Sequence, residues 1–200
     1  MEKQRVEALS DAILAIIVTI MALELQLPNE LTVAGLSSML PMIFIYITSF
    51  LQIMAVWLYY HELYKLVDHV SVHLFGANSL WLLTASFVPL ATRGVGQNFA
   101  NFEFLLFYLI VLALWDVAWI IMTATVIKTS QRQLSAEEKK MPYRWAILYG
   151  LQLVFILLVC YLFPNLIPFA PLLMIINVIY GFLSNKSWKR LKIMANRHRL

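Results

Sequence analysis

Cysteine is almost absent from this sequence, with Cys160 the only one among 200 residues. A single cysteine excludes an internal disulfide, a CxxC redox pair and a zinc site built on cysteines. Cys160 lies in the apolar stretch LLVCYLF, where we expect it to be a small buried hydrophobic side chain.

Charged residues are also scarce. They make up 13% of the chain, whereas 62% of the residues are hydrophobic and the mean hydropathy is +0.77. Soluble domains contain about a quarter charged and about half apolar residues, so a soluble protein is excluded. The net charge is +4, but the charges flank apolar runs and form no basic stripe for a nucleic acid. We predict an all-α integral membrane protein with one domain, residues 1–200, and no nucleic-acid partner.

Long runs without charge indicate the transmembrane segments. A spanning helix needs about 20 residues, so about six of them would leave only short loops. The run from Trp145 to Asn185 has no charged residue and is long enough for two spans, which Pro164, Pro168 and Pro171 divide into a hairpin. The expected spans lie at about residues 9–27, 41–60, 76–92, 102–127, 145–163 and 166–183.

The basic residues predict the orientation. An even number of spans places both termini on one side, and every one of the 15 lysines and arginines except Arg93 then falls on that side. Lysine and arginine concentrate in the cytoplasmic loops of membrane proteins. We therefore expect both termini to be cytoplasmic.

Three carboxylates within the expected spans stand out: Asp11 and Glu24 in the first, and Asp116 in the fourth, which also has Glu103 at its start. An ionisable side chain in a membrane is costly, so each is a functional candidate. Asp11 is either part of an intramolecular ion pair or hydrogen-bonded cluster that fixes the first span, or a proton or cation site. Glu24 either concentrates cations at an outer mouth or reaches water at a helix end. Asp116 either bonds to a neighbouring helix or couples to a substrate.

The chain lacks the motifs of an enzyme. His61, His69 and His73 follow the second span, but their spacing does not form HExxH. We therefore expect no metal site, and a hydrogen-bonding or interfacial role for His61. There is also no GxSxG nucleophile, Gly-rich phosphate loop or intramembrane protease pair. The sequence predicts that the protein is not an enzyme and has no cofactor.

One face of the first span is formed by Ile16, Ile20 and Leu23, which follow i, i+4, i+7 spacing, and Thr19 borders it. Every face of a membrane helix is apolar. The spacing alone therefore favours ordinary contact with the protein core or with lipid.

The start of the first span carries a recognisable motif, Arg5-Val-Glu-Ala-Leu9-Ser10-Asp11. It resembles the Arg-x-x-x-Phe-Ser-Asp signature of the transmembrane protein 175 family, which comprises potassium channels of animal lysosomes and endosomes and shorter prokaryotic relatives. Leu9 stands where the family has phenylalanine, and it keeps an apolar side chain there.

Two further segments, Trp57–His61 and Asn78–Thr92, resemble the second and third spans of that family. The specific motifs thus lie in the first half of the chain, although the resemblance extends over all the expected spans. The sequence is similar to a short, single-repeat prokaryotic member of the family.

This resemblance implies a potassium channel that favours potassium over sodium and has no carbonyl selectivity filter. In the family, the first helix of each repeat lines the pore, and bulky apolar side chains form its constriction. Counted from the Ser-Asp motif, the constriction falls on Ile16, with Ile20 and Leu23 further out and Thr19 as the adjacent threonine. Hydrophobic constrictions can gate by dewetting.

The resemblance also implies an assembly. Animal members contain two six-span repeats and pair up, whereas this chain holds one copy of the motif, so a homotetramer is expected in the plasma membrane of a prokaryote. Arg5, Ser10, Asp11 and His61 would form a network on the cytoplasmic side that holds the pore helix.

Two other functions stay open from the sequence. The first is a proton- or cation-coupled transporter that uses Asp11, Glu24 and Asp116. A channel should keep its flux without Asp116, whereas a coupled carrier should not. The second is an accessory membrane subunit, in which polar residues at Ile16 would leave ion flow unchanged.

Overall fold

The computed structural model describes residues 2–28, 32–130, 135–170 and 173. These ranges form a helical protein and contain no β-strand. The helices are α1 (Lys3–Leu23), α2 (Val33–Ser38), α3 (Leu40–Tyr64), α4 (Val72–Ala85), α5 (Val88–Gln97), α6 (Phe102–Thr129) and α7 (Ala136–Leu162), followed by the 3₁₀ helix η1 (Pro164–Phe169).

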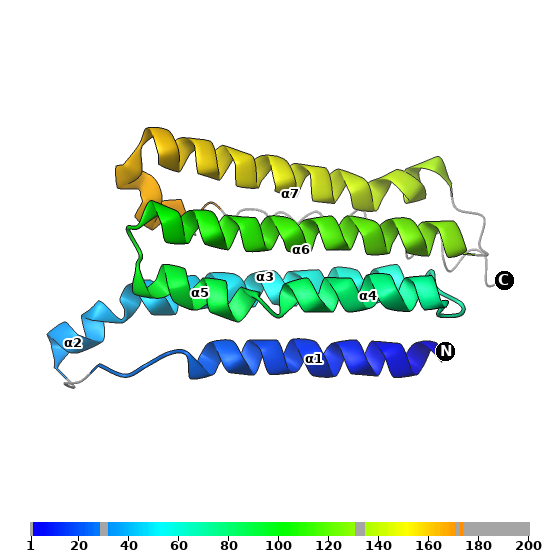
Figure 1. Cartoon of the computed structure of the whole chain (residues 1–200), viewed down its shortest axis with the longest axis horizontal. Helices are drawn as coiled ribbons and strands as arrows, with labels where there is room; N and C mark the ends of the chain where they lie inside the picture. Colours follow the sequence, from blue (N-terminus) through cyan, green and yellow to red (C-terminus); the bar gives the residue numbers. More distant parts are fainter. Residues whose placement is uncertain (1, 29–31, 131–134, 171–172, 174–200) are drawn as a thin grey trace.

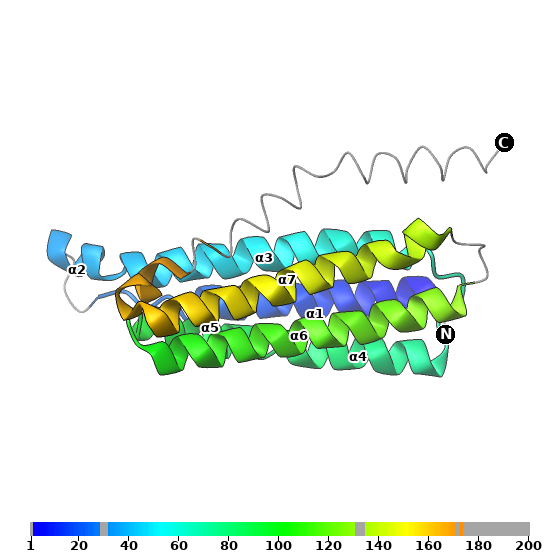
Figure 2. The same cartoon turned by 90° about the horizontal axis from the view of Figure 1, so that it is seen from above.

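The long helices lie side by side in one bundle (Figures 1 and 2). α4 and α5 follow one another along a single line, and α6 lies between them and α7 in Figure 1. α1 contacts α3, α4 and α5, whereas α7 contacts α6. α1 therefore lies at one side of the bundle and packs against neighbours along only part of its circumference.

Most of the predicted spans correspond to helices in the structure. By length and composition, the segments 3–23, 33–64, 72–97 and 102–129 could each cross a membrane, and 146–162 is a shorter apolar helix. α1 begins at Lys3, before the expected span at 9–27. It also ends earlier than expected, because its last turn closes at Leu23 and Glu24 is its C-cap. α7 begins before residue 145, within a charged segment. Most of the expected sixth span, 166–183, lies outside the described residues.

The third span is not one continuous helix. α4 ends at Ala85 and α5 begins at Val88, with Ser86 and Phe87 between them. Pro89 has no backbone N–H, so it cannot bond to the carbonyl of Ala85 and cannot continue that helix. The interruption divides the span into two half-helices, which both contact α1 and α6.

The core is aromatic where α3, α4 and α6 meet. The rings of Tyr60 and Trp81 stack in parallel with centroids 5.0 Å apart, and Trp81 also stacks on Trp115 at 6.1 Å. All three side chains are buried. Large aromatic side chains contribute heavily to core packing, so this cluster gives α1 a firm surface to pack on.

Candidate pore-lining helix

One side of α1 is packed against the rest of the bundle. Its buried residues follow helical spacing and face the neighbouring helices α3, α4 and α5. They are Val6, Ser10, Leu14, Ile17 and Met21. This side fixes the rotation of α1 about its own axis.

The residues assigned to a pore from the sequence lie on another side of the same helix. Ile16, Ile20 and Leu23 are 55%, 42% and 82% exposed, although they are large and hydrophobic. Thr19 is exposed as well, and its hydroxyl donates to the backbone carbonyl of Ile16 at 2.8 Å. The threonine oxygen keeps acceptor capacity, because a hydroxyl has two lone pairs. These residues form one apolar surface that no described part of the chain covers.

Ser10 joins α1 to two other helices. Its side chain is fully buried, and its oxygen accepts hydrogen bonds from the Tyr60 hydroxyl at 2.9 Å and the Asn78 amide at 3.0 Å. It also donates to the carbonyl of Val6 at 2.9 Å. These bonds use the one donor and both acceptor positions of the hydroxyl. Ser10 therefore fixes the N-terminal half of α1 to α3 and α4.

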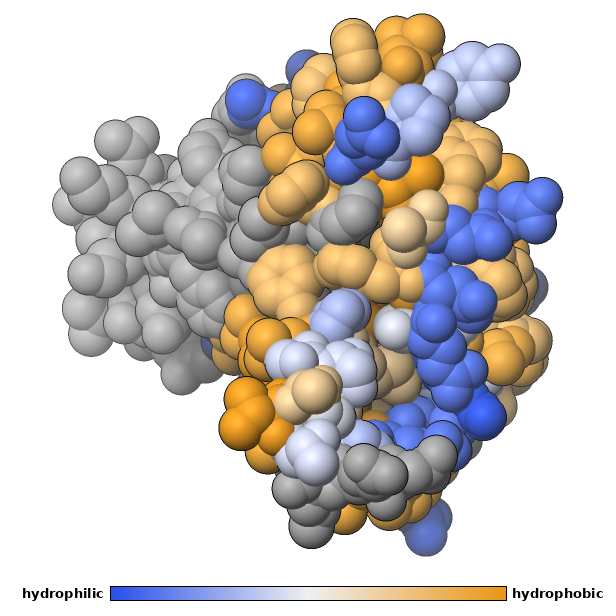
Figure 3. Space-filling model, turned by 90° about the vertical axis from the view of Figure 1, so that its left-hand side faces the viewer, coloured by the Kyte–Doolittle hydropathy of each residue, from blue (hydrophilic) through white to orange (hydrophobic). Residues whose placement is uncertain are grey.

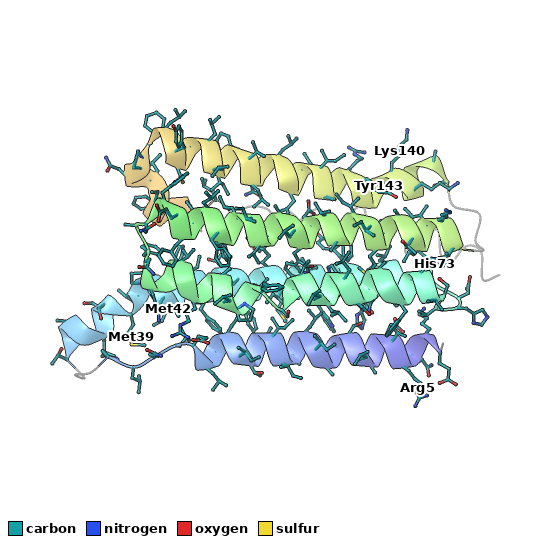
Figure 4. All side chains as sticks on the ribbon, in the orientation of Figure 1. Arg5, Met39, Met42, His73, Lys140 and Tyr143 are labelled. Atoms are coloured by element: carbon teal, nitrogen blue, oxygen red, sulfur yellow. The ribbon has the colours of Figure 1, made fainter. Side chains whose placement is uncertain are left out.

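Asp11 attaches the same part of α1 to α3 by a second hydrogen bond. Trp57 Nε1 in α3 donates to Asp11 Oδ1 at 2.9 Å, and the His61 ring lies 4.6 Å from the Trp57 ring. Arg5 is exposed and points away from the bundle in Figure 4, and it forms no ion pair with any described residue. The structure thus brings Ser10, Asp11 and, through Trp57, His61 together, but leaves Arg5 apart.

Glu24 forms an ion pair at the other end of α1. Its carboxylate lies 3.0 Å from the guanidinium of Arg93 in α5. One turn earlier, Thr92 Oγ1 lies 3.7 Å from Met21 Sδ and donates to Ser49 in α3 at 2.9 Å. The C-terminal end of α1 is therefore held by α5.

Asp116 lies half-buried in α6, away from α1. A Cβ on Gly150 would be 3.7 Å from Asp116 Oδ2, which places the carboxylate beside α7. Asp116 makes no hydrogen bond or ion pair within the part of the chain that the structure describes. Nearby, Gln52 of α3 donates to the Tyr149 hydroxyl of α7. Asp116 belongs to a separate polar region between α3, α6 and α7.

Sequence reasoning missed several partners of α1. Tyr60, Asn78 and Arg93 were not predicted as site residues, although a polar residue within an apolar run is the signal that could have found them. Within the described ranges, no three His, Cys, Asp or Glu side chains are placed to hold a metal ion. The polar groups around α1 attach this helix to α3, α4 and α5.

Comparison with known proteins points to one family. Residues 5–89 match the sequence model of the family described as the endosomal/lysosomal potassium channel TMEM175. This segment of the chain is similar to the TMEM175 family. The matched region begins at Arg5 and contains Ser10, Asp11, Trp57 and Asn78.

Two bacterial potassium channels are each similar to part of this chain. A potassium channel of Chryseobacterium sp. (strain P1-3) is 40% identical over 98 residues, which cover 49% of this chain and 51% of the relative. A potassium channel of Chamaesiphon minutus is 33% identical over 97 residues, 46% of this chain and 48% of the relative. The chain thus spans about half the length of the curated relatives it matches.

The fold itself is similar to a solved structure over a longer part of the chain. The crystal structure of a lysosomal potassium-selective channel TMEM175 homologue from Chamaesiphon minutus superposes with a TM-score of 0.74. The superposition covers 92% of this chain and 97% of the other, at 20% sequence identity. The helical arrangement is therefore that of a TMEM175 homologue over nearly the whole chain.

Proposed function

We propose that this protein is the subunit of a potassium-permeable channel in which copies of α1 surround one pore. The observation that carries the proposal is the exposed apolar side of α1, formed by Ile16, Ile20 and Leu23. The opposite side of the same helix is buried and hydrogen-bonded, so α1 is held in a fixed rotation. The sequence model of the family described as an endosomal/lysosomal potassium channel matches residues 5–89, which contain most of this helix.

In this proposal Ile16 forms the narrowest part of the pore. A ring of isoleucine side chains offers no hydrogen bonds to water, so the constriction empties when it is narrow and fills when the helices spread. Ile20 and Leu23 continue the apolar lining, and Thr19 supplies hydroxyl groups beside the constriction. The larger potassium ion loses its hydration shell at a lower cost, which favours potassium over sodium.

The assembly that fits this pore is a homotetramer in the plasma membrane of a prokaryote, with both termini cytoplasmic. Arg5 and Lys140 lie at the same end of the bundle (Figure 4), whereas Arg93 is on α5, whose last turn lies at the opposite end (Figure 1). That separation agrees with an inside rich in lysine and arginine. At that end, Ser10 and Asp11 hold the pore helix to α3 and α4. The permeant ion needs no cofactor.

The first test is potassium flux. Purified protein in liposomes should pass potassium faster than sodium down a concentration gradient, without a proton gradient. Saturable flux that requires a proton gradient would contradict the channel. If neither potassium nor sodium crossed the membrane, an accessory subunit would be favoured.

Substitution of Asp116 distinguishes a channel from a coupled transporter more clearly. Asp116 is half-buried in α6 and makes no hydrogen bond or ion pair with a described residue. We expect Asp116→Asn to leave potassium flux within about twofold of the wild type, since this residue lies away from α1. Asp68→Asn, at an exposed loop position, is the matched control. If Asp116→Asn abolished flux while Asp68→Asn did not, the protein would be a coupled transporter and the channel proposal would be wrong.

A further inference from the structure

The two ends of α1 are held by different halves of the interrupted third span. Near the N-terminal end, Asn78 of α4 donates to Ser10. Near the C-terminal end, Thr92 of α5 contacts Met21, and Arg93 of α5 pairs with Glu24. The two attachments of α1 are thus made to two separate half-helices, α4 and α5.

The half-helix that holds the outer end is itself tightly fixed. Val88, Ala91 and Val95 of α5 are buried against the bundle. A Cβ on Gly96 would overlap the side chain of Met42 in α3, so the two backbones approach closely there. α5 is thus closely packed against the bundle.

The Glu24–Arg93 ion pair is placed where a carboxylate alone would be unfavourable. Glu24 is the C-cap of α1, and the C-terminal end of a helix carries a partial negative charge. Arg93 compensates both the carboxylate and the helix end, and it is the only lysine or arginine between Lys65 and Lys128. Figure 3 shows this end of the molecule, where a strip of hydrophilic side chains crosses a largely hydrophobic surface. The pair is the electrostatic contact between α1 and α5.

We propose that the Glu24–Arg93 pair is the outer anchor of the pore helix and controls how readily α1 leaves its packed position. This inference rests on the proposed function, because it assigns a regulatory contact to the same helix. It also gives Glu24 a role other than concentrating cations, since its charge is matched by Arg93. A side-chain exposure of 28% for Glu24 and 42% for Arg93 makes the pair easy to break.

The experiment uses the full chain with Glu24→Gln, Arg93→Gln and the double exchange Glu24→Arg with Arg93→Glu. Two quantities are measured: potassium flux in liposomes, and amide hydrogen exchange of the last turn of α1. Each single variant should raise flux about twofold to fivefold, the range of a partly exposed ion pair, and should speed exchange in that turn. The double exchange should return both towards the wild type. Glu103→Gln, an exposed carboxylate at the start of α6, is the control.

The direction of the two single variants distinguishes an anchor from a surface-charge effect. An anchor is lost whichever partner is removed, so Glu24→Gln and Arg93→Gln change flux in the same direction. A charge effect on cations would lower flux in Glu24→Gln and raise it in Arg93→Gln, and that result would overturn the inference. Unchanged hydrogen exchange in both variants would overturn it too. If exchange responds but the wild type passes no potassium, the anchor stands, whereas the proposed function and the control of flux both fail.

Discussion

Replacing Ile16 with asparagine should raise potassium flux by about tenfold or more and reduce its discrimination against sodium. In the proposed homotetramer every subunit contributes one Ile16 to the constriction, so one substitution alters the whole ring. Asparagine offers hydrogen bonds that keep water in a narrow passage, which removes the dewetting barrier. A tenfold rise corresponds to a barrier lowered by about 1.4 kcal/mol, a modest demand on several side chains. Gradient-driven flux of each ion into liposomes measures the change.

The control for this substitution is Ile110→Asn. Ile110 lies on α6 and is 47% exposed, close to the 55% of Ile16, but it is not on the pore helix. The Ile110→Asn substitution should leave the flux of both potassium and sodium unchanged. Equal effects of the two substitutions, or no effect of Ile16→Asn in a protein that conducts, would remove Ile16 from the constriction.

Replacing Ser10 with alanine should lower the free energy of unfolding by about 2–4 kcal/mol. The substitution removes an acceptor that both the Tyr60 hydroxyl and the Asn78 amide use. Each buried donor left without an acceptor costs about 1–3 kcal/mol. Water cannot easily replace the lost oxygen, because Ser10, Tyr60 and Asn78 are all fully buried. Denaturant unfolding of the purified protein in detergent measures the loss.

Ser79→Ala is the matched control for Ser10. The Ser79 hydroxyl donates to the Phe75 carbonyl within its own helix and is exposed, so it links no two helices. We expect a change within about 0.5 kcal/mol, as for other surface substitutions. If Ser10→Ala were no more destabilising than Ser79→Ala, the hydrogen bonds of Ser10 would not be what holds α1.

Much of the helical architecture could be predicted from the sequence, because charge-free runs of spanning length leave few other solutions in a membrane. α3 and α6 agree with the expected spans to within a few residues. The break between α4 and α5 was not predicted, although Pro89 marks it. The early start of α7 was missed because charged residues such as Lys139 and Lys140 suggested a loop, whereas the helix continues through them.

Less of the candidate site than of the fold could be predicted from the sequence. Periodicity placed Ile16, Ile20 and Leu23 on one face, but it could not tell whether that face is packed or exposed. The partners of Ser10 lie 50 and 68 positions away, and no local pattern relates them. The Glu24–Arg93 pair depends equally on a tertiary contact that brings α5 beside the end of α1.

The most direct test of the account is thiol block of flux at Ile20. In a Cys160→Ser background, Ile20→Cys is treated with a cationic, membrane-impermeant methanethiosulfonate during potassium flux. The control is Ile121→Cys on α6, because Ile20 and Ile121 are equally exposed at 42%. If the exposed side of α1 lines the pore, the reagent blocks flux through Ile20→Cys and leaves Ile121→Cys unaffected. Undiminished flux through fully modified Ile20→Cys would show that ions do not pass along α1.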